Sequence, residues 1–279
     1  MACSSEAAAI EVKRKNILHH NVEADFFEAF HPEGSSSYEK AKVLKDISLI
    51  ARSLNENAVC IDIGCGTGFV TSFELPRFEN VVALDICKKM LTALKRRLSN
   101  SDNLNLVLCD AENVPLRDGI ADAVSASSVL HHLPKPSIAI LEMSRILRRG
   151  GFLYISREPN DIRFRRLFAL LDVTLSKLAG FAGHCIFPRR RRRKTLIEDL
   201  SNLEGLNYEE VDIHYRKGFD VGELSGFLLL KGLKVISAHS YHWLFSKPAY
   251  KANFMLENAP LSKSLGRYVC VISRKPSAQ

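Results

Sequence analysis

The sequence predicts an α/β fold of the doubly wound kind, in which a mostly parallel sheet carries helices on both faces. Three observations predict it. Short β-branched, apolar runs alternate with helical stretches over the first 157 residues. A glycine-rich turn, residues 64–68, directly follows the first of these runs. Hydrophobic residues make up 46% of the chain and charged residues 25%, as in an ordinary globular protein. Because strands separated by helices need right-handed crossovers, the alternation favours parallel strands.

Helices are expected where apolar residues recur at spacings of three and four. Leu44, Ile47 and Ala51 share one face of the first such segment. The expected helices are residues 38–54, 88–98, 137–147 and 221–230. The expected strands are residues 59–63, 81–85, 104–109, 121–127, 151–156, 233–239 and 267–274. Ligands of such sheets bind beyond the carboxyl ends of the strands, so a site is expected there.

Length and cysteine content indicate the number of domains and the cellular compartment. Its 279 residues suffice for one large domain, or for one domain with an insertion. No stretch reaches the roughly 18 apolar residues of a membrane span. The first twenty residues are too charged for a signal peptide, and the seven cysteines form no CxxC pair. These features predict a cytoplasmic protein with free thiols and no metal site.

The net charge of +8 is concentrated in one segment. Residues 148–194 hold thirteen Lys and Arg against three acidic residues, so the rest of the chain is close to neutral. Apolar residues at helical spacing between Phe164 and Leu178 are followed there by the basic run 189–194. Three interpretations stay open for this segment: contact with an anionic membrane surface through residues 163–194, contact with RNA phosphates, or a solvated charge run on a cap helix.

The most informative stretch for chemistry is Asp62-Ile63-Gly64-Cys65-Gly66-Thr67-Gly68. It follows an expected strand, where glycines let the backbone approach a bound nucleoside. The dinucleotide fingerprint GxGxxG does not fit, because its third glycine falls on Phe69 or Thr71. A phosphate-binding loop does not fit either, because no Gly-Lys-Ser/Thr follows.

This stretch resembles motif I, D/E-x-G-x-G-x-G, of the class I S-adenosylmethionine-dependent methyltransferases, in their small-molecule "type 11" branch. The likeness continues with Asp85, with Asp110-Ala111-Glu112, and with segments 129–133 and 142–151. Asp85 stands where the family binds the two ribose hydroxyls, a task that suits a carboxylate because its two oxygens can accept a hydrogen bond from each hydroxyl. The resemblance implies S-adenosylmethionine as cofactor. The residues implied to bind it are Asp62, Gly64, Cys65, Gly66, Gly68, Asp85, Ile86, Asp110, Ala111 and Ser127.

The resemblance also implies an architecture. It is a seven-stranded, mostly parallel, Rossmann-like methyltransferase fold with a cap between its fifth and sixth strands. Residues 1–37 would be an N-terminal lid region, which contains His19-His20-Asn21. Residues 38–279 would be the methyltransferase domain, with a basic cap insertion at about 160–215.

Methyl transfer from a sulfonium is an in-line displacement, so alignment and exclusion of water are the main tasks of the protein. A base is needed only where the acceptor must lose a proton. The candidates are His131 and Glu158, with a structural role at a helix start as the alternative for the adjacent histidines. Acceptor contacts are predicted at Tyr38, His132, Asn160 and Tyr241. Core packing is the alternative for Tyr241, and an ordinary surface helix is the alternative for Tyr38.

These features favour a methyltransferase that acts on a small, apolar or amphipathic acceptor. An RNA methyltransferase that uses the run 189–194 is second, because the chain lacks the Asn/Asp-Pro-Pro-aromatic motif and the Pro-Cys phrase of nucleic-acid methylation. No DNA partner is expected. A cofactor-binding regulatory or assembly protein without turnover is the alternative of another class, because a retained binding site does not prove chemistry.

Overall fold

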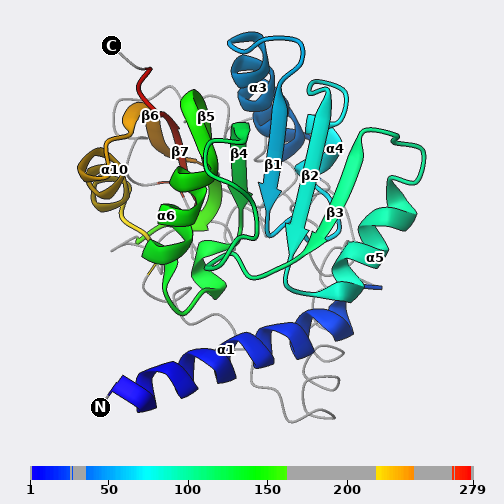
Figure 1. The fold of residues 1–279 in the computed structure, drawn as a ribbon, viewed down its shortest axis with the longest axis vertical. Helices are drawn as coiled ribbons and strands as arrows, with labels where there is room; N and C mark the ends of the chain where they lie inside the picture. Colours follow the sequence, from blue (N-terminus) through cyan, green and yellow to red (C-terminus); the bar gives the residue numbers. More distant parts are fainter. Residues whose placement is uncertain are drawn as a thin grey trace, which may run out of the picture.

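The computed structural model describes residues 2–25, 27, 36–161, 218–241, 266 and 268–277. In this part of the chain one seven-stranded sheet runs in the order β3-β2-β1-β4-β5-β7-β6 (Figure 1). Strands β3 to β5 in this order are parallel, and β7 is antiparallel to both of its neighbours. The strands are β1 (Val59–Ile63), β2 (Asn80–Asp85), β3 (Leu104–Leu108), β4 (Ala121–Ser127), β5 (Leu147–Pro159), β6 (Lys234–Tyr241) and β7 (Tyr268–Arg274). The doubly wound, mostly parallel sheet expected from the sequence is confirmed.

Helices cover both faces of the sheet, and one further helix crosses its lower edge. The described helices are α1 (Ala2–Glu23), α3 (Ser37–Arg52), α4 (Thr71–Glu74), α5 (Lys88–Arg97), the 3-10 turn η2 (Leu130–His132), α6 (Pro136–Ile146) and α10 (Val221–Leu230). Helices α3, α4 and α5 lie on one face, and α6 and α10 lie on the other. Helix α1 lies beyond the carboxyl ends of the parallel strands (Figure 1). No helix in the described ranges is long and apolar enough to cross a membrane.

Successive side chains of a strand point to opposite faces of the sheet, so the strands contribute to two hydrophobic cores, one on each face. In β5, Phe152 and Tyr154 pack toward α3, whereas Leu153 and Ile155 pack toward α6 and α10. A strand covered on both sides must therefore be apolar at nearly every position. This explains why the strands read in the sequence as continuous apolar runs.

Most element bounds agree with the sequence to within two residues, and β5 is the main exception. The expected strand 151–156 is extended at both ends, to Leu147–Pro159. Its last residues pair with β7, which lies more than a hundred positions later, as in Glu158 opposite Val269. A local pattern cannot report such a long-range pairing. Of the expected cap at about 160–215, all but the first two residues lie outside the described residues.

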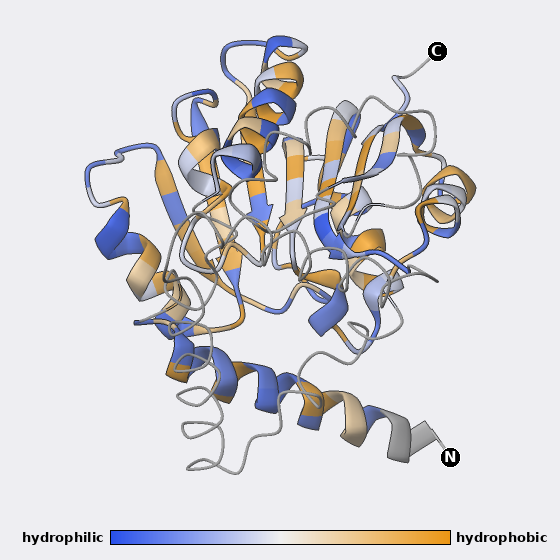
Figure 2. Cartoon of the chain, turned by 180° about the vertical axis from the view of Figure 1, so that it is seen from behind, coloured by the Kyte–Doolittle hydropathy of each residue, from blue (hydrophilic) through white to orange (hydrophobic). Residues whose placement is uncertain are grey.

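Helix α1 occupies the place of the expected lid region. Hydrophilic and hydrophobic residues are mixed along it (Figure 2), and it has no continuous apolar stripe. Its buried residues are polar: Asn16, His19 and Glu23 are each at most 5% exposed. Hydrophobic periodicity therefore could not reveal a 22-residue helix here.

Candidate active site

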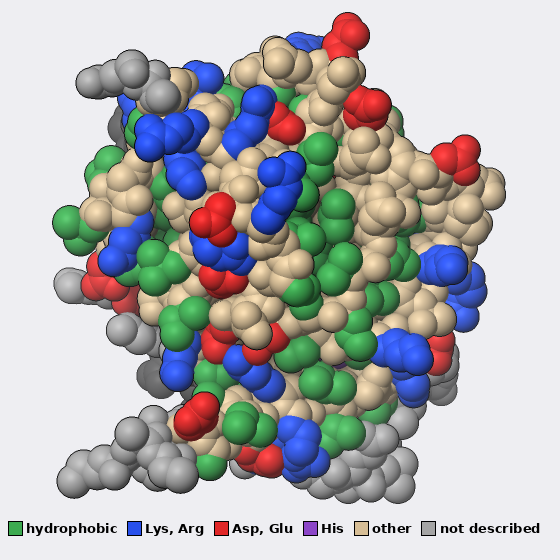
Figure 3. Space-filling view, viewed as in Figure 1, with side chains coloured by type: hydrophobic (Ala, Val, Ile, Leu, Met, Phe, Trp, Pro, Cys, Tyr) green, Lys and Arg blue, Asp and Glu red, His purple; other side chains and the backbone are tan. Residues whose placement is uncertain are grey.

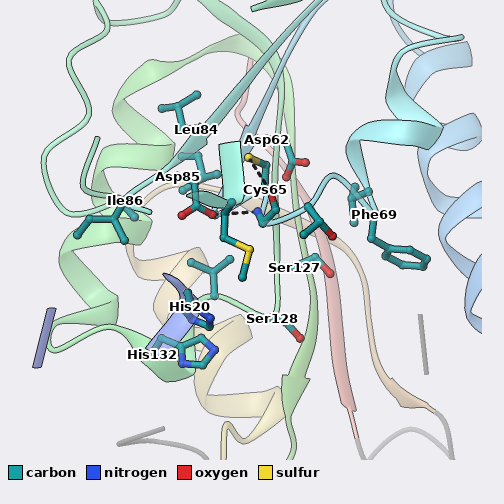
Figure 4. A pocket seen from close by; sticks show the side chains of 18 of the residues that line it. His20, Asp62, Cys65, Phe69, Leu84, Asp85, Ile86, Ser127, Ser128 and His132 are labelled. Atoms are coloured by element: carbon teal, nitrogen blue, oxygen red, sulfur yellow. Dashed lines mark hydrogen bonds between the residues drawn. The ribbon is translucent and has the colours of Figure 1, made fainter. Parts of the chain in front are cut away.

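A cavity of about 390 Å³ opens at the carboxyl ends of β1, β2 and β4, beneath α1. The chain order reverses between β1 and β4, which is where doubly wound sheets bind ligands. We call residues 62–70 and 85–86 the floor of this cavity and α1 residues 13–23 its roof. Figure 4 shows Asp85 and Cys65 of the floor facing His20 of the roof across the cavity.

The three motif glycines have different tasks, although all have positive φ, at +66° for Gly64, +53° for Gly66 and +87° for Gly68. A Cβ on Gly64 would lie 2.3 Å from Val129 Cγ2, and one on Gly68 would lie 2.9 Å from Leu94 Cγ. A Cβ on Gly66 would meet no described atom within 4 Å. Gly66 therefore keeps the cavity open, whereas Gly64 and Gly68 permit close packing. Gly68, predicted to bind the cofactor, packs against α5 instead of lining the cavity.

Asp85 is held in place by the backbone of the floor. Its Oδ2 accepts a hydrogen bond from Gly66 N at 2.9 Å, and its Oδ1 accepts one from Cys87 N at 2.8 Å. Burial raises the pKa of Asp85, although these two N–H groups act in the opposite direction. Each carboxylate oxygen has a second lone pair, so the side chain can still accept hydrogen bonds from two hydroxyl groups of a ligand in the cavity. Ile86 also lines this side of the cavity.

Below the floor lies a buried polar cluster that the sequence revealed only in part. Asp62 Oδ2 accepts from Thr71 Oγ1 at 2.6 Å, and Ser125 Oγ bridges Asp62 Oδ1 at 3.2 Å and Glu74 Oε1 at 2.5 Å. Burial raises the pKa of Asp62 to about 6 and that of Glu74 well above its usual value. The cluster fixes the start of the glycine loop from beneath. No motif marks Glu74, because it reaches Asp62 only through the fold.

Glu158 lies beneath the loop that follows β4 and is fully buried, so it is not at the cavity. Its carboxylate accepts from the N–H groups of Val129, Leu130 and His131 at 2.7 to 3.1 Å, and from His131 Nδ1 at 2.9 Å. Burial raises its pKa, but the His131 ring and these N–H groups outweigh that and lower it below the usual value. The structure therefore makes Glu158 a positioning residue and leaves His131, which lines the cavity, as the candidate base.

Two predicted acceptor contacts, Tyr38 and Tyr241, belong to the core. Both are 0% exposed, and their ring centroids are 6.4 Å apart in the cluster beneath α3. The expectation that they touch an acceptor is corrected, because large aromatic rings gain more from burial between helix and sheet. Asn160 is also buried, and its Nδ2 donates to Gly266 O at 2.7 Å. His132, by contrast, lines the cavity (Figure 4).

The remaining predicted cofactor residues, Asp110, Ala111 and Ser127, also line the cavity. Asp110 is tied to the roof, because Lys13 Nζ lies 2.6 Å from its Oδ2 and 2.6 Å from Glu112 Oε2. Asn16 Nδ2 adds a hydrogen bond to His132 O at 3.0 Å. The sequence did not mark Lys13, since its acidic partners lie nearly a hundred residues away.

Two non-glycine residues with left-handed backbone lie at the cavity, Ser128 with φ 59° and Arg157 with φ 58°. They fasten the ends of β4 and β5 together, because Ser128 N donates to Ser156 O at 3.0 Å and Ser128 Oγ donates to Arg157 O at 3.1 Å. The Arg157 guanidinium lies 4.9 Å from the centroid of the Phe69 ring. Strained backbone of this kind is frequent at functional sites.

A second, basic hollow lies at the opposite edge of the sheet, where Figure 3 shows Lys and Arg gathered near the C-terminal segment. Its charges largely serve the fold. Arg145 pairs with Glu142 and Asp118, and Lys275 Nζ donates to the carbonyl groups of Ser144 and Leu147. We therefore place the chemistry at the first cavity.

The residues of the first cavity fit S-adenosylmethionine. The floor offers a bidentate carboxylate for ribose hydroxyls, at Asp85, and Gly66 leaves room that a Cβ would fill. Apolar side chains such as Ile86, Val129 and Leu133 line the walls beside polar groups. This mixture suits a nucleoside joined to an aliphatic chain.

Comparison with known proteins agrees with this geometry. Residues 61–155 match the family described as methyltransferase domain. An uncharacterized chloroplastic methyltransferase of Arabidopsis thaliana is 37% identical over 154 residues, which cover 52% of this chain and 42% of that protein. Demethylmenaquinone methyltransferase of Staphylococcus aureus is 27% identical over 139 residues, which cover 48% of this chain and 58% of that protein. The chain thus matches less than two thirds of the length of either relative.

Among solved structures, a SAM-dependent methyltransferase of Thermotoga maritima superposes with a TM-score of 0.55 at 15% identity, over 93% of this chain and 99% of that one. The likeness at this identity concerns the fold. Residues 61–155 are thus similar to a methyltransferase domain, and the fold of the chain is the one found in solved S-adenosylmethionine-dependent methyltransferases.

Proposed function

We propose that the protein transfers a methyl group from S-adenosylmethionine to a small, apolar or amphipathic acceptor. One observation carries the proposal. The Asp85 carboxylate is fixed by Gly66 N and Cys87 N at the floor of a cavity that α1 covers. A ribose recognised there would lie beside the glycine loop, with the rest of the cavity left for an acceptor.

The bound cofactor supplies an electrophilic methyl group on a positively charged sulfur. The residues of the chain orient the two reactants and exclude water, which is where most of the rate gain of such displacements arises. Where the acceptor is a hydroxyl or an amine, we propose His131, one of several imidazoles at the cavity, as the group that takes its proton. Glu158 holds the His131 ring in one orientation through its contact with Nδ1.

The choice of acceptor class rests on the cavity walls. Apolar side chains from the floor, from α5 and from the loop after β4 line it, among them Phe69, Met90 and Leu133. The S. aureus relative is named for a quinone, demethylmenaquinone, which is an apolar ring compound. We also propose that the basic segment 163–194 contacts an anionic membrane surface, which would give access to such a compound. These residues lie outside the described ranges.

Calorimetric titration with S-adenosylmethionine tests the cofactor site. Asp85→Ala removes the carboxylate and should weaken binding by about ten- to a hundredfold, corresponding to about 1.5 to 3 kcal/mol. Asp118→Ala, a matched change at the opposite edge of the sheet, should leave the affinity unchanged. Absence of binding to the folded wild type would contradict the proposal.

Labelled methyl transfer into fractionated extracts then tests turnover and acceptor class. Label in a lipid-soluble, low-molecular-weight fraction supports the proposal. Label in RNA, with binding that weakens steeply as salt rises, would favour the RNA methyltransferase. Tight cofactor binding with no labelled product in any fraction would favour the regulatory or assembly protein.

We also propose that the protein resides in the cytoplasm, a reducing compartment. The five cysteines that the structure describes, Cys60, Cys65, Cys87, Cys109 and Cys270, are free thiols. Imaging of a fluorescent fusion tests this, and accumulation in an organelle would contradict it.

A further inference from the structure

Three side chains that bind metals readily come together at the end of α1. Glu23 lies one helical turn beyond both His19 and His20, so spacings of four and three place all three on one side of the helix. His19 Nε2 is 3.3 Å from Glu23 Oε1, and His20 Nδ1 is 3.6 Å from Glu23 Oε2. One nitrogen or oxygen atom from each residue lies within 4.8 Å of the other two.

Burial sets this triad apart from ordinary surface charges. His19 is 4% exposed and Glu23 is 3% exposed, and all three side chains line the cavity. In addition, His20 Nδ1 is buried and has no hydrogen-bond partner among the described residues, although it points toward Glu23. An imidazole nitrogen in that position has a lone pair to offer.

We propose that His19, His20 and Glu23 bind a divalent transition-metal ion of the zinc type. Two histidines and one glutamate are an established ligand set for zinc sites that keep one position open. Ligand atoms about 2.0 to 2.1 Å from a tetrahedral ion lie about 3.3 Å apart. The separations of 3.3 Å to Glu23 Oε1 and 3.6 Å to Glu23 Oε2 are close to this value.

The ligand types also select the metal. Two imidazole nitrogens favour zinc, cobalt, nickel or copper over calcium and magnesium, which prefer oxygen ligands. The open position would face the cavity, where a water or an acceptor hydroxyl can occupy it. Metal binding by these residues does not depend on methyl transfer, so the two proposals can fail separately.

Titration of the chelator-treated full chain with Co²⁺ tests the site, because tetrahedral or five-coordinate cobalt absorbs visible light. We expect one equivalent of cobalt to bind, with zinc displacing it. Glu23→Gln keeps the shape of the side chain and should weaken cobalt binding at least tenfold. Glu11→Gln, the same change on an exposed face of the same helix, should leave the affinity unchanged.

Circular dichroism shows whether each variant is folded. Zinc should raise the melting temperature of the wild type and of Glu11→Gln more than that of Glu23→Gln. Absence of stoichiometric cobalt binding, or equal binding by both variants, would overturn the proposal. A strong near-ultraviolet thiolate band would also overturn it, because Cys65 and Cys109 line the same cavity. If calorimetry in metal-free buffer still shows S-adenosylmethionine binding, the failure concerns the metal site alone.

Discussion

The floor and the roof of the cavity are held by different kinds of contact. Buried carboxylates in and beside the floor hold it in place. Asp85 of the floor and Glu158 beside it accept hydrogen bonds from backbone N–H groups, and Asp62 of the floor accepts from two buried hydroxyls. The roof is held by side-chain contacts from one helix, among them those of Lys13 and Asn16. The comparison teaches that the cofactor site is built into the sheet, whereas its cover is attached at a few points.

The strongest test of this comparison removes a carboxylate from beneath the floor. Glu158→Ala leaves three backbone N–H groups and the His131 ring without their buried acceptor. We expect the free energy of unfolding to fall by about 3 to 5 kcal/mol. Urea unfolding followed by circular dichroism measures it. Glu158→Gln, which keeps one acceptor oxygen, should lose less, and a loss below about 1 kcal/mol for Glu158→Ala would refute the positioning role.

Two alanine variants distinguish a glycine needed for packing, Gly64, from a glycine that leaves space for a ligand, Gly66. Gly64→Ala forces a Cβ against Val129 and strains the left-handed backbone, so stability should fall by about 3 kcal/mol. Gly66→Ala adds only the backbone strain of about 1 kcal/mol, but its Cβ enters the cavity and should weaken cofactor binding at least tenfold. Unfolding curves and calorimetry of the two variants check both statements. The reverse order of stability would contradict them.

The cluster beneath the floor should make stability depend on pH. The folded-state pKa values of Asp62 and Glu74 exceed their ordinary values near 4, so the folded state holds extra protons and stability falls as pH rises from about 4 through about 6. Glu74→Gln mimics the protonated acid. It should match the wild type near pH 4 and exceed it by about 1 kcal/mol at pH 8.

Urea unfolding across this pH range measures the effect, with Glu56→Gln as an exposed control. If the wild type and Glu74→Gln showed parallel pH profiles, Glu74 would not be the titrating group.

The smallest effect on stability is expected at the roof. Lys13→Met removes a partly exposed ion pair with Asp110 and Glu112, which should cost less than about 1 kcal/mol. The effect on the local stability of α1 should be larger, because this helix loses its ion pairs with the loop after β3. Hydrogen exchange of the α1 amides should quicken severalfold while the strand amides stay protected. Lys95→Met on the exposed side of α5 serves as control, and unchanged exchange in Lys13→Met would show that other contacts hold the roof.

Much of the fold and of the floor could be predicted from the sequence, because the signals are local. The strands 59–63 and 121–127 appear with the expected bounds, since both are short apolar runs that end in polar or glycine residues. Asp85 and the glycine loop were found for the same reason. The residues that match the cofactor motif are neighbours in the chain, and the fold needs only one strand end to present them.

The rest depended on contacts between distant segments. Tyr38 and Tyr241 meet in the core across two hundred residues, and Gly68 faces a helix whose position no motif records. Lys13 reaches Asp110 only once α1 lies across the sheet. The sequence predicts no metal site because no CxxC is present, whereas helical spacing and burial together bring His19, His20 and Glu23 within range.

The left-handed backbone of Ser128 and Arg157 has a consequence for laboratory evolution. Residues held in this conformation carry about 1 to 3 kcal/mol of strain each, which the hydrogen bonds between the ends of β4 and β5 offset. A library selected only for heat tolerance would favour residues such as asparagine or glycine at these two positions, because they accept that backbone more readily. Ser128→Gly would also remove the hydrogen bond from Ser128 Oγ to Arg157 O, so thermostability and catalytic activity should be selected together at these sites.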